Sequence, residues 1–492
     1  MCTQSEQDVT NDARSLVRNC GLATVCGLAF CWFASAAHGQ CLIGDLTGAD
    51  SGQGDSFGYT LAISGDTAIV SALGDDTPGG TNAGSAYIFV HAGGAWTQQA
   101  QLLASDGAAS DQFGYDVAID GDTAIVGADW DDTLAGINAG SAYVFVRAAN
   151  GVWTQQAKLV ATDSSAFDLF GVSVAVSGDT AVVGAPGDNT LAGTDAGSAY
   201  VFVRDNEGVW TQQARLFASD GAAGDFFSGY AVAIDGDTVV VGAINDDTQA
   251  GTDAGSAYVF VRDGNGVWSE QAHVFASDSA AFDYFGSIVA ISGDTIIAGA
   301  DEDDTQGGTD AGSAYVFVRN EDTWTEEAHL FAPESDADAD DHFGWFVDIS
   351  GDTAVVGAPT IPQFGGDPEL GSVYAFQRVG AIWTQKAHVF APAGAVGDVF
   401  GFSVAVSGAT AVAAPGFNNV MAASAYAFDL GCTPGDLNCD NAVTVADVPH
   451  FIDALISPGS FTGCDIMRAD MNADSLNDGR DTAAFAAALV GE

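Results

Sequence analysis

A Phe-Gly pair recurs along the chain at nearly constant spacing, and this repeat constrains the fold more than any other feature of the sequence. The pair stands at Phe57, Phe113, Phe170, Phe285, Phe343 and Phe400, and at Phe227 it is lengthened to Phe-Ser-Gly. Consecutive copies are 56 to 58 residues apart. A period of this length, with no helical pattern inside it, indicates a supersecondary unit that packs against copies of itself.

Each copy carries the pattern of short β-strands. In the third copy, β-branched runs flank Ser177-Gly178, a dipeptide typical of tight turns. The pattern predicts a hairpin in which Val172, Val174 and Val176 point to one side and small residues to the other. A third strand is expected after the polar loop that follows, and a fourth begins at a tryptophan. These tryptophans are Trp96, Trp153, Trp210, Trp268, Trp324 and Trp383.

Seven four-stranded antiparallel units bury their faces best when they close radially into a β-propeller, since closure leaves only short protected edges. An open solenoid is the alternative. The seventh copy ends near Asp429 without a tryptophan strand, whereas residues 41–46 lie where a fourth strand would precede the first copy. We therefore expect an all-β, seven-bladed propeller over residues 40–430, in which the N-terminal segment supplies the outer strand of the last blade.

Three short motifs recur in order in these units: Phe-Gly, Gly-Asp-Thr (121–123 and 178–180) and Gly-Ala-Pro (184–186 and 357–359). In this respect residues 50–430 resemble the FG-GAP repeats of integrin α-subunit propellers and of many bacterial surface proteins. The resemblance implies a role in binding or adhesion at a cell surface. Integrin repeats that bind calcium carry an Asp-rich loop in the hairpin. Ser177-Gly178 leaves no room for that loop, so calcium is not carried over to the blades.

The first 39 residues have the organisation of a secretory signal peptide. Arg14 and Arg18 precede an apolar run over residues 21–37, which is followed by small residues. No later segment is apolar for long enough to span a bilayer. We therefore expect a secreted, extracellular or cell-surface protein without a transmembrane segment.

The chain is strongly acidic, with 12 Lys and Arg against 66 Asp and Glu and a net charge of −54. Such a field repels nucleic acid and anionic lipid, and it attracts cations, basic partners and divalent metals. A solvated acidic shell that keeps an exported protein soluble explains the same composition.

Four cysteines remain after the signal peptide: Cys41, Cys432, Cys439 and Cys464. An even number in an exported chain indicates two disulfides, for which three pairings exist. Their positions relative to the repeats favour Cys41–Cys432 across the closure of the ring and Cys439–Cys464 within the C-terminal segment.

Composition changes at Gly431, and residues 431–492 contain two twelve-residue loops rich in Asp and Asn. Calcium takes six to eight oxygen ligands, and the spacing of these residues could wrap them round one ion per loop. The predicted ligands are Asp436, Asn438, Asp440, Ala442 and Asp447 in the first loop and Asp470, Asn472, Asp474, Leu476 and Asp481 in the second, with Ala442 and Leu476 contributing backbone carbonyls. The sequence predicts two calcium ions.

An apolar stripe of helical period follows each loop, as at Phe451 and Leu455. This loop-helix pair, with its opening Gly435-Asp-Leu-Asn, resembles a small α-helical dockerin domain. The resemblance implies a cohesin-like or other surface protein as partner. A calcium-stabilised terminal module without a cohesin partner carries equal weight, because Val445-Ala446 and Gly479-Arg480 depart from the hydroxyl pair of cellulosomal members.

Acidic residues also recur in the blades. One set lies two residues before each Phe (Asp55, Asp111, Asp168, Asp225, Asp283, Asp341, Asp398) and another lies five residues earlier (Asp50, Asp106, Asp163, Asp220, Asp278, Asp336). We interpret the sets as turn-forming residues rather than as an acidic binding rim. Loops such as Asp131-Asp132-Thr133 could hold calcium weakly, but simple solvated turns explain them better.

Two tryptophans and three histidines are further candidate functional residues. Trp130 interrupts one acidic loop, and an exposed tryptophan there could stack on a carbohydrate or anchor a matrix protein, while core packing is the alternative. Core packing is the preferred interpretation for Trp345. His273, His329 and His388 share one position of the repeat, where we expect only an outward polar side chain.

No catalytic constellation is found in the sequence. We therefore expect a non-enzymatic binding or adhesion protein, with a polysaccharide-degrading glycoside hydrolase or lyase, attached through its dockerin, as the alternative.

Overall fold

A computed structural model describes residues 41–333, 337–360, 371–391, 399–416 and 424–431. The predicted signal peptide and the dockerin-like segment lie outside these residues. So do the ten predicted calcium ligands, Cys432, Cys439 and Cys464, and two acidic positions of the repeat, Asp336 and Asp398. The described residues contain strands and turns, and among them no helix is long and apolar enough to cross a bilayer.

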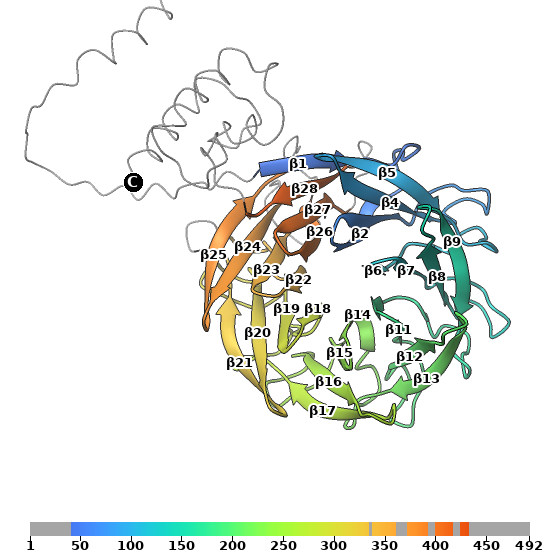
Figure 1. Ribbon diagram of the computed structural model, residues 1–492. Helices are drawn as coiled ribbons and strands as arrows, with labels where there is room; N and C mark the ends of the chain where they lie inside the picture. The colour runs from blue at the N-terminus through green and yellow to red at the C-terminus, as the bar shows by residue number, and fades with distance from the viewer. Residues whose placement is uncertain (1–40, 334–336, 361–370, 392–398, 417–423, 432–492) are drawn as a thin grey trace, which may run out of the picture. The chain divides into compact units, whose positions relative to one another are not determined.

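The strands form seven four-stranded antiparallel sheets, which are the blades of a propeller (Figure 1). Blade 1 comprises β2 (Phe57–Ser64), β3 (Thr67–Ala72), β4 (Ser85–Ala92) and β5 (Ala95–Leu102). Blade 2 comprises β6 (Val117–Asp120), β7 (Thr123–Ala128), β8 (Ser141–Arg147) and β9 (Trp153–Leu159). Blade 3 comprises β10 (Val174–Ser177), β11 (Thr180–Ala185), β12 (Ser198–Arg204) and β13 (Trp210–Leu216).

Blade 4 comprises β14 (Phe227–Asp235), β15 (Thr238–Ala243), β16 (Ser256–Arg262) and β17 (Trp268–Val274). Blade 5 comprises β18 (Val289–Ser292), β19 (Thr295–Ala300), β20 (Ser313–Asn320) and β21 (Thr323–Leu330). Blade 6 comprises β22 (Phe346–Ser350), β23 (Thr353–Ala358), β24 (Ser372–Val379) and β25 (Ile382–Val389). Blade 7 comprises β26 (Phe400–Ser407), β27 (Thr410–Pro415), β28 (Ala425–Asp429) and β1 (Cys41–Leu46).

The N-terminal strand closes the ring, as the sequence predicted. β1 pairs antiparallel with β28, and Cys41 lies opposite Asp429 while Leu46 lies opposite Ala425. Leu46 is fully buried among residues of blades 1 and 7. The seven-bladed all-β propeller is therefore confirmed, and the open solenoid is wrong.

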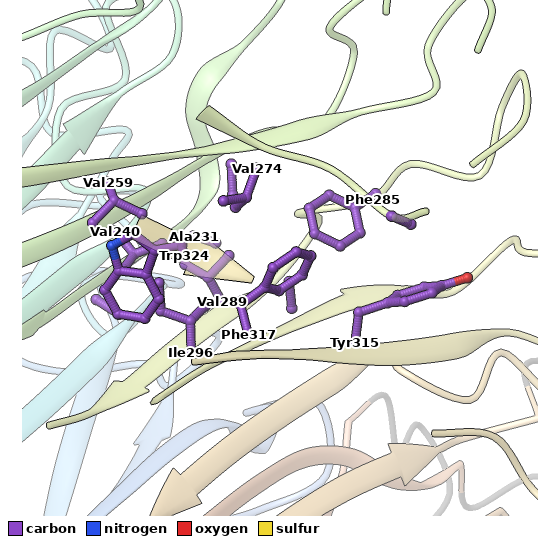
Figure 2. Packing of buried hydrophobic residues seen from close by; sticks show 14 of the residues in the cluster. Ala231, Val240, Val259, Val274, Phe285, Val289, Ile296, Tyr315, Phe317 and Trp324 are labelled. Carbon is purple, nitrogen blue, oxygen red and sulfur yellow. The ribbon is translucent and has the colours of Figure 1, made fainter. Parts of the chain in front are cut away.

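The hydrophobic core of the described residues contains seven main clusters, each of which lies between two neighbouring blades. Figure 2 shows the one between blades 4 and 5, where Phe285 packs edge-on against Tyr315 and Phe317, with ring centroids 5.7 and 5.8 Å apart. Phe285 is the phenylalanine of a Phe-Gly pair and is fully buried. Because each first strand packs against a neighbour on both faces, Val174 and Ala175 enter different clusters. Val172, expected to share the side of Val174, lies before β10 and borders the centre of the ring instead.

The glycine of the pair allows two blades to approach closely. A Cβ on Gly171 would lie 2.3 Å from the carbonyl oxygen of Ser141 in the preceding blade, and its φ is +102°. Only glycine combines that backbone conformation with that approach. The Phe-Gly motif thus places a large core side chain next to a site where no side chain fits.

The tight turns between first and second strands form a second closed circle. In each blade, the Ser or Asp before the turn glycine accepts a hydrogen bond from the backbone N–H of the next blade's turn glycine, at 2.6–3.1 Å. The donor and acceptor pairs are Gly65–Ser407, Gly121–Ser64, Gly178–Asp120, Gly236–Ser177, Gly293–Asp235, Gly351–Ser292 and Gly408–Ser350. The bond from Gly65 to Ser407 joins the first blade to the last, so these bonds complete the ring.

Blades 1 to 6 are also joined, each to the next, through an arginine near the end of the third strand in blades 2 to 6. In blade 3, Arg204 donates to Asp179 at 2.7 Å and to Thr123 of the preceding blade at 3.1 Å. Its guanidinium lies 5.1 Å from the ring centroid of Trp210, in cation–π geometry. The indole N–H of Trp210 donates to Gln156 of the preceding blade at 2.8 Å. The equivalent arginines are Arg147, Arg262, Arg319 and Arg378.

Candidate ligand-binding site

The two faces of the ring differ in their loops. One face, which we call the loop face, carries the loops that enter each first strand and those between second and third strands, such as 160–173 and 186–197 in blade 3. The opposite hairpin face carries the tight turns, such as Gly178-Asp179. Most of the acidic repeat positions lie on the loop face.

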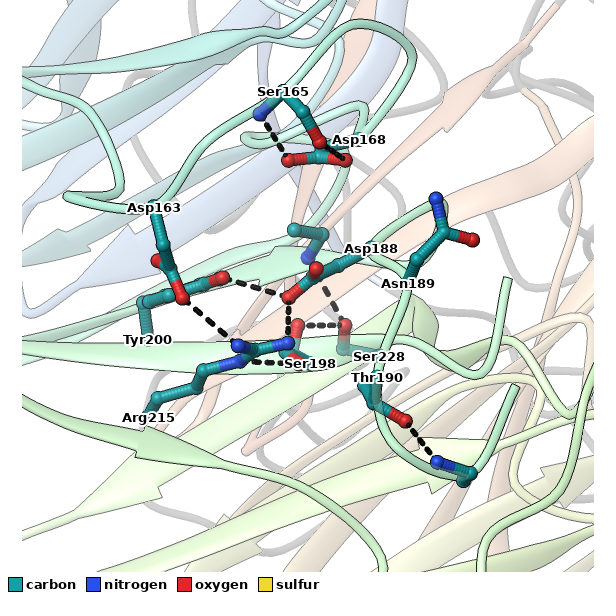
Figure 3. Close-up of polar contacts among 12 residues, drawn as sticks. Asp163, Ser165, Asp168, Asp188, Asn189, Thr190, Ser198, Tyr200, Arg215 and Ser228 are labelled. Carbon is teal, nitrogen blue, oxygen red and sulfur yellow. Dashed lines mark hydrogen bonds and ion pairs between the residues drawn. The ribbon is translucent and has the colours of Figure 1, made fainter. Parts of the chain in front are cut away.

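The first acidic set stabilises turns. Asp168 accepts the backbone N–H of Ser165 at 2.6 Å and its hydroxyl at 2.9 Å (Figure 3). The same backbone bond, from the residue three positions earlier, is made by Asp55, Asp111, Asp225, Asp283 and Asp341. The turn-forming interpretation is therefore confirmed for this set in the described copies.

The second set belongs to a polar network at the outer part of the loop face. In blade 3, Arg215 contacts Asp163 at 2.8 Å and Asp188 at 2.6 Å, and the Tyr200 hydroxyl donates to Asp188 at 2.7 Å (Figure 3). Asp188 is buried, so describing the Asp-rich loops as simple solvated turns is wrong for their first carboxylate. The second member does cap the loop, since Asn189 accepts the Asp195 N–H at 3.1 Å.

The same network recurs in blades 1, 2, 4 and 5, where the outer-strand residue is glutamine, lysine or histidine. Gln101, Lys158, His273 and His329 occupy the place of Arg215. His273 stacks on Tyr258 with centroids 4.1 Å apart and lies between Asp220 and Asp246, at 3.6 and 3.3 Å. The expectation of a merely outward polar side chain is thus wrong, because the ring is partly buried against Tyr258 and lies between two carboxylates. Within the described ranges, no group of three or more His, Cys, Asp or Glu is placed to hold a metal ion.

A cavity of about 440 Å³ lies at the centre of the ring on the loop-face side, and all the blades contribute to its wall. The residue directly after each Phe-Gly or Phe-Ser-Gly motif faces this cavity. These residues are Tyr59, Tyr115, Val172, Tyr230, Ser287, Trp345 and Phe402. Two more aromatic residues, Phe226 and Tyr284, directly precede the Phe of their motif and also line the cavity. The two residues directly after the Gly-Ala motif in blades 4 and 5 complete most of the wall: Ile244, Asn245, Asp301 and Glu302.

Four aromatic rings form a continuous arc across blades 6, 7, 1 and 2. Trp345 lies 5.5 Å from Phe402, Phe402 lies 5.6 Å from Tyr59, and Tyr59 lies 5.4 Å from Tyr115, measured between centroids. Trp345 is half-buried and borders the cavity, so the interpretation of this residue as core packing alone is wrong.

Three carboxyl groups line the cavity, and they differ in their partners. Asp116 accepts the backbone N–H groups of Val117 at 2.8 Å and Val174 at 2.7 Å, and burial raises its pKa to about 7. Asp301 accepts the Ser287 hydroxyl at 2.8 Å and lies 4.0 Å from Nδ1 of His342. Both are held by the frame.

Glu302 is the third carboxyl group and makes no hydrogen bond or ion pair with any described residue. Burial raises its pKa to about 7, with smaller contributions from the charges of Asp301 and Asp310. No lysine or arginine is among the residues that line the cavity. Its carboxylate is therefore available to a ligand.

Trp130 lies away from this cavity, on the loop face of blade 2. It is 43% exposed and lines a separate pocket of about 270 Å³ with Ile137 and Lys158. Ile137 is also exposed, and its carbonyl accepts the N–H of the exposed Phe167 at 2.9 Å. We call these three exposed residues, which lie in neighbouring loops of blades 2 and 3, the apolar patch. The ligand-binding role of Trp130 stays a prediction.

The residues of the axial cavity were missed from the sequence, although a signal was present. The position after Phe-Gly varies between Tyr, Val, Ser, Trp and Phe among the copies, while the pair itself is nearly constant. Variation inside a constant motif separates residues that line a site from residues that build the frame.

No curated protein matches the chain. The family model for the FG-GAP repeat matches it in seven segments, which together cover more than half of its length: residues 43–89, 96–145, 153–202, 210–260, 268–317, 324–376 and 383–428. Each segment begins in or beside an outer strand and ends in the third strand of the next blade, so the sequence repeat is offset from the blade by one strand. This offset is the one that the closing strand β1 requires, and the chain belongs to the FG-GAP repeat family.

Proposed function

We propose that the protein is a secreted or cell-surface binding or adhesion protein, without catalytic activity of its own, that presents the loop face of its propeller to an extracellular ligand. The observation that carries the proposal is that constant and variable positions of the repeat lie in different parts of the propeller. Constant residues fix the frame through the Phe-Gly packing and the circle of turn hydrogen bonds. Variable residues meet at the axial cavity and at the apolar patch of Trp130, Ile137 and Phe167.

The apolar patch supports a macromolecular ligand. Blades 3, 4 and 5 carry Thr194, Thr252 and Thr309 where blade 2 carries Ile137, so the frame does not require an apolar residue there. Trp130 likewise stands where blade 4 carries Asn245. Exposed tryptophan and phenylalanine beside a polar rim are typical of carbohydrate and protein contacts. A glycan or a matrix protein is the ligand class we propose for this patch.

The tail completes the proposal. Two Asp- and Asn-rich loops within residues 431–492 have calcium-ligand spacing, and we propose that they bind two calcium ions and fold a dockerin-like module. This module would attach the propeller to a cohesin-like or other surface protein. The Cys41–Cys432 and Cys439–Cys464 bonds would fasten it to the ring and stabilise it, and the signal peptide would deliver the chain to the outside.

The test is a solid-phase screen of the secreted chain against extracellular glycans and matrix proteins. The double variant Trp130→Asn, Ile137→Thr carries residues that other blades already contain, so its frame is preserved. We expect it to lose at least about tenfold in affinity for the ligand found. Val209→Thr, on the exposed hairpin face, is the matched control.

Unchanged binding by the double variant would place the ligand elsewhere. Depolymerisation of a glycan by the wild-type chain would contradict the proposal and favour the attached polysaccharide-degrading enzyme.

A further inference from the structure

We infer that the axial cavity binds a small organic cation, an ammonium group with apolar substituents, between the aromatic arc of Trp345, Phe402, Tyr59 and Tyr115 and the carboxylate of Glu302. This inference deepens the proposed function. It rests on the proposed function in one respect, namely that the protein binds its ligand without transforming it.

The size and the wall of the cavity favour a small molecule. A volume of about 440 Å³ lies within the range of sites that enclose small ligands. The ring centroids of the arc are 5.4 to 5.6 Å apart, so the rings form one surface over four blades. Aromatic faces attract a cation within about 6 Å of the ring centroid, and such walls recognise quaternary ammonium groups.

The charge of the cavity selects the sign of the ligand. Its wall holds three carboxyl groups and no lysine or arginine. The described part of the chain contains eight lysines and arginines, and seven of them pair with aspartates of the frame. None of these seven lines the cavity. An anion would meet only like charge there, whereas a cation is attracted by the wall and by the net charge of −54.

Glu302 is the group that a cation would pair with. Asp116 and Asp301 already accept hydrogen bonds from the frame, and Glu302 accepts none from the described residues. A half-buried carboxylate without a partner is destabilised by desolvation, and a cation at van der Waals distance relieves this cost more than a neutral hydroxyl does.

Binding should therefore depend on pH. Several titratable groups surround Glu302. Asp301 and Asp310 lie in its own loop, Tyr284 lies in the loop entering blade 5, and His342 lies in the loop entering blade 6. Asp116 and the tyrosines line the cavity from other blades. With a pKa of about 7, Glu302 is mostly neutral at pH 6 and mostly ionised at pH 8. The affinity for a permanent cation should rise by about tenfold between these values.

The experiment is titration calorimetry of the full secreted chain with choline and with 3,3-dimethylbutan-1-ol, the neutral isostere of choline. We expect choline to bind and the isostere to bind at least about tenfold more weakly. Glu302→Gln should weaken choline binding by about tenfold at pH 8 and reduce its pH dependence to the part that Asp116 contributes, because Asp116 lines the same cavity and also has a pKa of about 7. Trp345→Leu should weaken it at both pH values. Glu207→Gln, in an exposed turn of the hairpin face, is the matched control and should bind as wild type.

Thermal melts of each variant distinguish loss of the site from loss of the fold. Equal affinity for choline and its isostere, no heat with either, or an unchanged Glu302→Gln variant would each overturn the inference. These outcomes are separable from the proposed function. If choline does not bind while the glycan or matrix ligand still does, only the inference fails, and the reverse result contradicts the role of the apolar patch alone.

Discussion

Replacing Leu46 by Ala tests whether the N-terminal strand is an integral part of the ring. Leu46 ends β1 and is fully buried in the cluster between blades 7 and 1. Leu159 ends the outer strand of blade 2 and is buried to nearly the same extent, at 3% exposure. If β1 is the seventh copy of the outer strand, the two leucines are equivalent although one lies near the start of the chain.

The magnitude follows from burial. Leu→Ala removes three carbon atoms, which at about 0.8 kcal/mol per buried methylene amounts to about 2.4 kcal/mol of lost transfer free energy. The cavity left behind adds to this, and fully buried leucines elsewhere lose about 2 to 5 kcal/mol. We expect Leu46→Ala and Leu159→Ala to lower the free energy of unfolding by the same amount within that range.

The assay is urea unfolding followed by tryptophan fluorescence. Trp96 reports on the closure directly, because a Cβ on Gly44 of β1 would lie 2.7 Å from its Cδ1. The control is Leu134→Ala, since Leu134 is fully exposed in a loop and should change the stability by less than about 0.5 kcal/mol.

A small effect of Leu46→Ala beside a large effect of Leu159→Ala would refute the reasoning. It would mean that blade 7 is stable with three strands and that β1 is an accessory. An equal and large effect, with a single transition in both variants, would show that the ring unfolds as a unit closed by its own N-terminus.

Three further predictions follow from other parts of the molecule. Gly140→Ala should abolish folding or cost several times the ~1 kcal/mol expected for a residue at positive φ alone, because a Cβ there would lie 2.1 Å from the Phe170 carbonyl oxygen. Gly121→Ala is the matched variant, since Gly121 also has a positive φ but has open space around it. Equal thermal shifts of the two variants would contradict the close-approach argument. Burial raises the pKa of Asp348 to about 7, so the native state holds a proton that the unfolded state releases above pH 4, and the wild type loses stability as the pH rises from about 4 to 7. The difference in stability between the wild type and Asp348→Asn should therefore shrink over that window and stay constant above it. A difference that is flat or grows with pH in thermal melts would count against the raised pKa. Calcium should raise the melting temperature of the full chain and EGTA should lower it, with Asp436→Ala reducing the response and Asp205→Ala, in an exposed turn of blade 3, leaving it intact; a melt insensitive to EGTA would rule out both tail sites.

The fold was predictable because local sequence patterns within each repeat mark its four strands. Ser177-Gly178 is a tight turn between β10 and β11, and Trp153 and Trp210 open outer strands as predicted. The closure was predictable because one tryptophan strand was missing at one end and one strand was left over at the other. Local patterns and a count of strands were sufficient for these results.

Contacts between repeats were not predictable in the same way. The bond from Gly178 to Asp120 joins residues 58 apart, and nothing in either turn indicates that its acceptor lies in the preceding blade. The network around Arg215 likewise joins Asp163 and Asp188 from two loops, and each of these residues alone resembles an ordinary solvated position. Such pairings require the geometry of the ring, which places equivalent positions of neighbouring copies side by side.

The distribution of positive charge connects the frame to the function. Five arginines, represented by Arg204, join blades 1 to 6 through an aspartate, a threonine and a tryptophan. Lys158 and Arg215 pair with loop carboxylates in blades 2 and 3. Each of these cations neutralises one or two aspartates that the frame itself requires. Since the frame uses nearly all the described cations, Glu302 has no cation to pair with among the described residues that line its cavity. Acidity that served only solubility does not explain a glutamate that has no partner among the described residues and lies in an aromatic cavity at the axis of the ring. The position of Glu302 is therefore the strongest reason to expect a cationic ligand there.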